Sequence, residues 1–165
     1  MADVMFNQHM IPHHQQAIEM SDVLLAKPGI DPRVVELANQ IKAAQGPEID
    51  QMRNRLNEWG MPAMSGGQGD EGDTTGHGGM PGMAGGMPGM GMMSDEDMSA
   101  LRSAEGVDAA KLFLSQMIQH HEGAIDMAQD EVEDGRDPQT IALAQSIITS
   151  QQREIDTMRS ILATL

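Results

Sequence analysis

A short stretch of this chain occurs twice, and the two copies match in register. The first copy is MIPHHQQAIEM, from Met10 to Met20, and the second is MIQHHEGAIDM, from Met117 to Met127. On a helix, residues three and four apart lie on the same side, so Met10, His13 and His14 share one face. Two adjacent imidazoles beside a thioether are unusual on a face that should be apolar. The repeat therefore restricts the fold and indicates a site.

A second matching segment follows each copy. Residues 29–56 align with residues 135–162, and both segments contain Asp-Pro, which is typical of a helix cap followed by a first-turn proline. A first helix is expected from a cap at Asp3 to about residue 26, and a second from Pro32 to about Trp59. The repeated unit is thus a helical hairpin, and two hairpins predict an all-α four-helix bundle.

The pattern divides the chain into three segments. Residues 1–59 are expected to form the first hairpin. Residues 94–165 are expected to form a short helix capped at Ser94 and then the second hairpin, whose long first helix begins at a cap on Asp108. Residues 60–93 form a long linker of mainly Gly, Met and Pro. This linker cannot bury enough apolar surface to fold alone, so we expect it to be disordered without a ligand.

Composition excludes several classes of function. The chain has no Cys, which rules out disulfides, thiolate metal sites and cysteine nucleophiles. Its net charge of −15 argues against nucleic acid and favours cationic partners. No apolar run approaches the roughly 20 residues of a membrane span. No export signal precedes the first helix, which leaves a cytoplasmic protein and the mature form of an exported one as alternatives.

Antiparallel pairing brings the same residue types together in both hairpins. It places His13 level with Gln45 and Met10 level with Glu48, and the second hairpin repeats this with His120, Gln151, Met117 and Glu154. An unpaired charge on the apolar stripe of a helix is costly. A protonated histidine or a bound cation would relieve that cost for Glu48.

The spacing also indicates which metal is bound. Di-iron bundles use Glu-x-x-His, whereas this chain has Met three residues before the first histidine of each pair. Exchanging a carboxylate for a thioether shifts the preference toward Cu(I), while imidazole also accepts Cu(II). The candidate bundle ligands are Met10, His13, His14, Met20, Glu48, Met52, Met117, His120, His121, Met127, Glu154 and Met158.

Two groups in that set have alternative interpretations. The methionines at positions 20, 52, 127 and 158 are equally well explained as core residues, because methionine fills irregular gaps. Glu48 and Glu154 are either ligands or partners that orient the imidazoles. All four histidines could also be structural groups that satisfy buried glutamates.

The linker carries a pattern of its own. Three Met-Pro-x-Met elements occur at residues 61–64, 80–83 and 87–90. A four-residue turn brings its first and fourth residues together, so each element pairs two thioethers. The linker is therefore expected to add weaker Cu(I) sites, with Met80, Met83, Met87 and Met90 as ligands.

The two Met-x-x-His-His-x-x-Ala stretches, each followed by Gln-x-x-Glu-Ile-x-x-Met, resemble a ferritin-like family of domains of unknown function (DUF) that includes the copper-binding protein CopM. The resemblance covers about residues 3–59 and 94–165. It implies a ferritin-like bundle in the periplasm or outside the cell, which binds copper through Met and His and limits copper toxicity. The Met-rich insert departs from this pattern and is similar to methionine motifs of bacterial copper-resistance proteins.

These observations favour a non-enzymatic copper buffer or carrier that exchanges copper ions with another copper-handling protein. The main alternative is a ferritin-like oxidase that converts Cu(I) to Cu(II). Because histidine binds metal only when neutral, acid near pH 5 is expected to release copper from the histidines before the thioethers.

Overall fold

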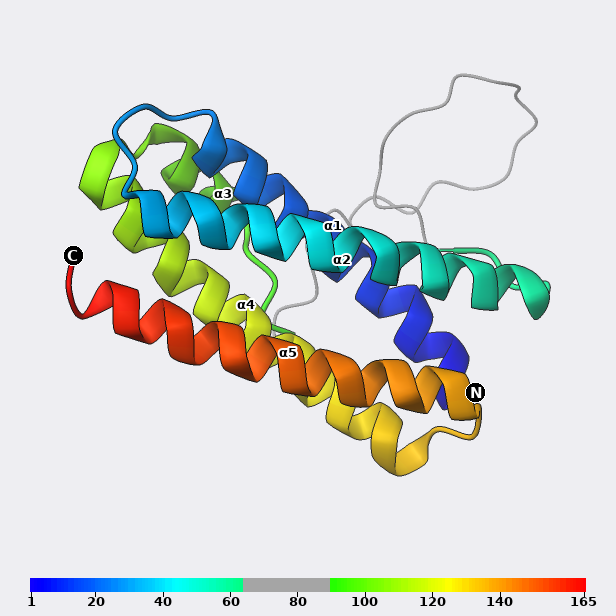
Figure 1. Cartoon of the computed structure of the whole chain (residues 1–165). Coiled ribbons are helices and arrows are strands. Elements are labelled where there is room, and N and C mark those ends of the chain that lie inside the picture. Colours follow the sequence, from blue (N-terminus) through cyan, green and yellow to red (C-terminus); the bar gives the residue numbers. More distant parts are fainter. Residues whose placement is uncertain (64–89) are drawn as a thin grey trace, which may run out of the picture.

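The computed structural model describes residues 1–63 and 90–165, which form five helices and no strand (Figure 1). The expected all-helical fold is therefore confirmed for the described residues. The expected disorder of the linker falls mainly on residues 64–89, which lie outside them. The helices are α1 (Ala2–Leu25), α2 (Pro32–Glu58), α3 (Asp95–Ser103), α4 (Gly106–Asp134) and α5 (Pro138–Leu162).

The four long helices pack as two antiparallel pairs. Helix α1 lies along α2 and helix α4 along α5, while α1 also packs against α4 and α2 against α5 (Figure 1). The short helix α3 packs on α1 and α4. The two copies of the repeated histidine stretch therefore lie on helices that contact each other directly.

Three of the expected helix caps are present. The Asp31 side chain accepts a hydrogen bond from the Arg33 amide at the start of α2, and the Asp137 side chain accepts one from the Thr140 amide at the start of α5. Ser94 and Asp97 form a reciprocal capping box at α3. These short local motifs fix where three of the five helices begin.

Two expected caps are wrong. Helix α1 begins at Ala2, after Met1, and α4 begins at Gly106, after Glu105; neither start has a side-chain cap. Asp3 and Asp108 lie in the first turns of these helices instead, where their charge favours the positive end of the helix dipole. Asp3 has a further role in tertiary contacts.

Asp3 ties the start of α1 to the turn between α4 and α5. Its Oδ1 accepts hydrogen bonds from the backbone amides of Arg136 (2.8 Å) and Asp137 (2.6 Å). Burial raises the pKa of Asp3, but these amides outweigh burial, and the net pKa is lowered. The adjacent Glu131 has its pKa raised to about 8, first by burial and then by the charge of Asp3.

The apolar core consists of two clusters. One includes Leu24, Phe113 and Met117, and the other includes Phe6, Ile11 and Met10. The two repeat-related methionines thus fall in different clusters, although each precedes a histidine pair. No helix of the described residues is long and apolar enough to cross a membrane.

Candidate metal centre

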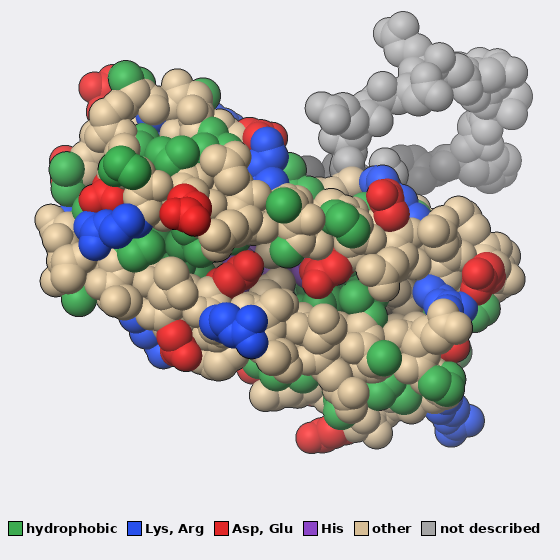
Figure 2. All heavy atoms as spheres, in the orientation of Figure 1, with side chains coloured by type: hydrophobic (Ala, Val, Ile, Leu, Met, Phe, Trp, Pro, Cys, Tyr) green, Lys and Arg blue, Asp and Glu red, His purple; other side chains and the backbone are tan. Residues whose placement is uncertain are grey.

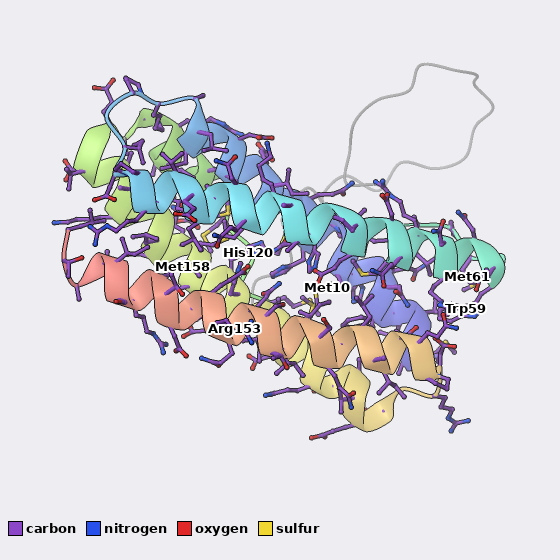
Figure 3. All side chains as sticks on the ribbon, viewed as in Figure 1. Met10, Trp59, Met61, His120, Arg153 and Met158 are labelled. Atoms are coloured by element: carbon purple, nitrogen blue, oxygen red, sulfur yellow. The ribbon has the colours of Figure 1, made fainter. Side chains whose placement is uncertain are left out.

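The repeated histidines are all buried inside the bundle. His13 and His14 come from α1, His120 and His121 from α4, and none is more than 1% exposed. Figure 3 shows His120 in the interior, between Met158 and Met10. The two matching stretches occupy helices that contact each other, and this contact brings the two histidine pairs together.

Two of the histidines form matching pairs with glutamates. His14 Nε2 lies 2.7 Å from Glu48 Oε2, and His121 Nε2 lies 2.6 Å from Glu154 Oε2. A carboxylate oxygen accepts hydrogen bonds, so Nε2 of each imidazole donates one. When the ring is neutral, its Nδ1 keeps a free lone pair. This arrangement resembles the outer partners that orient metal-binding histidines in proteins.

The other two histidines stack on each other. The ring centroids of His13 and His120 are 3.7 Å apart, with an interplanar angle of 38°. Burial, as the largest cause, lowers the pKa of His13 to about 3 and holds the pKa of His120 well below its usual value. Both rings are therefore neutral at physiological pH, which is the state that binds a metal ion.

The ring nitrogens of this group lack partners to an unusual degree. Buried polar atoms nearly always have a hydrogen-bond partner. In the described residues, no hydrogen-bond partner is found for the Nδ1 atom of any of the four histidines or for the Nε2 atom of His120. The side-chain nitrogen and oxygen of Gln45 also lack a partner there. Unpartnered imidazole nitrogens fit a metal ion, because coordination would satisfy them.

The repeated methionines fall in the two apolar clusters. One apolar cluster contains Met10 and Met52, with Met127 packed against it half-buried, and the other contains Met117, Met158 and Met20. Each residue of the first set is the repeat partner of one in the second. The methionines three residues before the two histidine pairs therefore lie in different clusters, Met10 in one and Met117 in the other.

The histidine and carboxylate side chains of the described residues do not form a complete metal site by themselves. Among residues 1–63 and 90–165, no group of three or more His, Asp and Glu side chains lies so that it could hold a metal ion. Glu48 and Glu154 each contact one imidazole, with 13% and 17% of their side chains exposed. Figure 2 shows a little histidine surface at the middle of one face, flanked by acidic side chains that would attract a cation.

Some candidate residues lie elsewhere or in an unexpected role. Met80, Met83 and Met87 fall outside the described residues. Met90 lies against the histidines through its backbone, because its carbonyl oxygen is 2.8 Å from His13 Nε2. Glu48 contacts His14 rather than standing alone opposite Met10. The Met90 carbonyl had no signal in the sequence, since a backbone acceptor leaves no residue pattern.

A family model described as a domain of unknown function, DUF305, matches residues 3–162 of this chain. The chain belongs to the DUF305 family. A comparison with functionally curated proteins finds no match. The resemblance expected from the repeated motifs is thus confirmed at the level of the family.

Solved structures of DUF305 proteins share this fold. A DUF305 fragment from Deinococcus radiodurans is 30% identical with a TM-score of 0.82, and the match covers 99% of this chain and 97% of the other. A Streptomyces coelicolor DUF305 protein, provisionally described as secreted, is 32% identical with a TM-score of 0.81, covering 99% and 91%. CopM in its Cu(I)-bound form is 28% identical with a TM-score of 0.74, covering 98% and 96%.

Proposed function

We propose that this DUF305 protein binds copper, preferentially Cu(I), and acts as a buffer or carrier in copper homeostasis and resistance. The observation that carries the proposal is the set of unpartnered Nδ1 atoms on four buried histidines. These atoms lie in helices that also present the repeated methionines. Copper is the cargo in this account, and the protein's own residues bind and release it.

The donor set suits a soft ion. Thioether sulfur favours Cu(I), and neutral imidazole accepts both Cu(I) and Cu(II). CopM, whose fold this chain shares, has been solved with Cu(I), with Cu(II) and with silver, which supports copper as the ion bound here. The proposed ligands are the histidines at positions 13, 14, 120 and 121, with the methionines of the two sets.

Glu48 and Glu154 are proposed to orient ligands. Each carboxylate holds the Nε2 of one imidazole and thereby leaves its Nδ1 for the metal. In the alternative, direct ligation, each glutamate would bind the metal through Oε1, because Oε2 contacts the imidazole.

The Met-rich linker is proposed to add Cu(I) capacity beside the bundle. Its Met-Pro-x-Met elements supply paired thioethers, although Met80, Met83 and Met87 lie outside the described residues. A location in the periplasm or outside the cell is proposed as well, supported by the relative provisionally described as secreted. Exchange with another copper-handling protein would follow from a carrier role.

An anaerobic competition titration with a coloured Cu(I) chelator tests the proposal. Replacing Met10 and Met117 together by Leu removes two sulfurs at nearly constant volume, so the core should tolerate the change. Copper affinity should fall at least tenfold, which is equivalent to about 1.4 kcal/mol or more of binding free energy. Met98→Leu is the matched control, because Met98 is also buried but lies in α3, outside the repeat.

The outcomes separate the three functions considered. Tight Cu(I) binding without oxygen consumption supports the buffer or carrier. Oxygen consumption that requires Cu(I) and the histidines would instead establish the oxidase. If the chelator kept all of the Cu(I) in the competition, the histidines would be interpreted as structural groups that satisfy the glutamates.

A further inference from the structure

The residues Met90–Met93, termed the strap, lie across the histidine site just before α3. The Met90 carbonyl oxygen is 2.8 Å from His13 Nε2. Gln16 makes two hydrogen bonds to Met93, one from its Nε2 to the carbonyl oxygen (2.8 Å) and one from the Met93 amide to its Oε1 (2.7 Å). Met93 is 5% exposed and belongs to an apolar cluster. The strap is thus fixed to α1 at both ends.

The strap also touches the backbone of α4, where glycine permits the contact. A Cβ atom added to Gly123 would lie 2.1 Å from the Met90 carbonyl oxygen and 2.7 Å from Gly91 Cα. Gly91 has a φ of +73°, and a Cβ on it would lie 2.6 Å from the Gln119 carbonyl oxygen. The docked strap therefore requires glycine on both sides of this crossing.

One of the differences between the two repeats falls where the strap docks. The copies share Met, His-His, Ala-Ile and Met at matching positions, but Gln16 of the first corresponds to Gly123 of the second. In α1 this position supplies the hydrogen bonds that hold the strap, and in α4 it supplies the space that the strap occupies. The departure from the repeat thus has one structural cause.

Docking makes the two stacked imidazoles inequivalent. A backbone carbonyl only accepts hydrogen bonds, so His13 donates from Nε2 and keeps its lone pair on Nδ1. Its repeat partner His120 has no hydrogen-bond partner at either ring nitrogen in the described residues. One ring is therefore held in a single tautomer by the strap, and the other has no contact of this kind with the strap.

We propose that the strap is a positioning element of the metal site, held by Gln16 and Gly123. When docked, it fixes the proton of His13 on Nε2, directs Nδ1 to the metal ion and covers the stacked pair of imidazoles. Release of copper then requires the strap to lift or the ion to leave beneath it. The part that concerns copper rests on the proposed function, whereas the tautomer of His13 does not.

Two variants displace the strap by different means. Gly123→Ala places a methyl group against the Met90 carbonyl, while alanine favours the helix by about 1 kcal/mol relative to glycine. Gln16→Leu removes both hydrogen bonds to Met93 and adds no clash. Gln15→Leu is the matched control, because it makes the same change one residue away, at a side chain without a hydrogen bond to the strap. Circular dichroism checks that each variant is folded. If Gly123→Ala does not fold, Gln16→Leu still provides the test.

The first measurement uses the metal-free full chain. Long-range ¹H–¹⁵N correlation spectra distinguish the two tautomers of a neutral imidazole. The wild type and Gln15→Leu should show His13 protonated at Nε2 alone, while Gly123→Ala and Gln16→Leu should show a mixture of tautomers. An unchanged His13 tautomer in both strap variants would overturn the proposal, whatever the protein binds.

The second measurement follows transfer of Cu(I) from the full chain to excess chelator without oxygen. Loss of an outer partner of a metal-binding histidine typically changes affinity by about 10- to 100-fold. Release should accordingly be about tenfold faster from the two strap variants than from the wild type and Gln15→Leu. Equal release rates would overturn the role in copper retention. A wild type that binds no Cu(I) would refute the proposed function and, with it, this role, while the tautomer result would still decide whether the strap positions His13.

Discussion

The buried carboxyl pair at the start of α1 predicts a specific dependence of stability on pH. Glu131 is 2% exposed, and its pKa is raised from 4.5 to about 8, mainly by burial and then by Asp3. When protonated, Glu131 can donate a hydrogen bond to Asp3. Glu131→Gln imitates this neutral donor at every pH and is therefore the informative change.

The magnitude follows from linkage between protonation and folding. Between pH 4.5 and about 8, the unfolded chain has lost the Glu131 proton and the folded chain has kept it. The free energy of unfolding therefore falls by about 1.4 kcal/mol per pH unit in this window. This stabilisation is complete below the unfolded pKa and is lost as pH rises through the folded pKa. From pH 6 to 8 the loss amounts to about 2 kcal/mol.

Urea unfolding followed by circular dichroism at pH 6, 7 and 8 provides the assay. The unfolding free energy of Glu131→Gln should rise relative to the wild type by about 2 kcal/mol from pH 6 to 8. Other titrating groups are common to both proteins and cancel in the difference. Glu133→Gln is the control, because Glu133 is exposed on the same helix and should follow the wild type. Parallel profiles for the wild type and Glu131→Gln would refute the reasoning.

Three further predictions concern the metal centre. In NMR titrations of the metal-free chain, His13 and His120 should stay neutral at pH 5, since burial lowers both pKa values; protonation near pH 6.5 would contradict this. Glu48→Gln should weaken Cu(I) binding by about 10- to 100-fold in a chelator competition, as expected of an orienting partner, whereas unchanged affinity would remove that role. Replacing Met80, Met83 and Met87 by Leu should lower the number of Cu(I) ions bound per chain while the tightest site remains; an unchanged number would reduce the linker to a spacer.

The low pKa values also correct an expectation drawn from the sequence. Acid near pH 5 was expected to compete with copper at all four histidines, because the reference pKa of histidine is about 6.5. Burial keeps His13 and His120 neutral at that pH, so protons compete there only at lower pH. Sequence alone does not give the depth of burial on which this shift depends.

The helices and the convergence of the histidines were predictable because their causes are local or repeated. Asp31 and Asp137 cap helices through hydrogen bonds to amides within three residues, and the Asp-Pro pattern predicts these caps. The repeat placed His13 and His120 on equivalent helices, and pairing equivalent helices buries them together. The glutamate partner of each second histidine follows from the same symmetry.

The remaining features depend on contacts between distant segments. Asp3 was expected to cap α1, but its carboxylate meets the backbone of Arg136, and no local pattern encodes that contact. The contact between the Met90 carbonyl and His13 likewise could not be predicted from a sequence pattern. A signal for the strap did exist, because Gln16 and Gly123 break an otherwise close repeat at the same position.

The central claim is that neutral imidazole nitrogen and thioether sulfur of the bundle hold the same Cu(I) ion. X-ray absorption spectroscopy tests it on the full chain with Met80, Met83 and Met87 replaced by Leu, loaded anaerobically with one equivalent of Cu(I). The account predicts imidazole nitrogen and sulfur together around copper, with the sulfur contribution reduced when Met10 and Met117 are also replaced by Leu. A spectrum with nitrogen or oxygen ligands alone, or with sulfur and no imidazole, would contradict it.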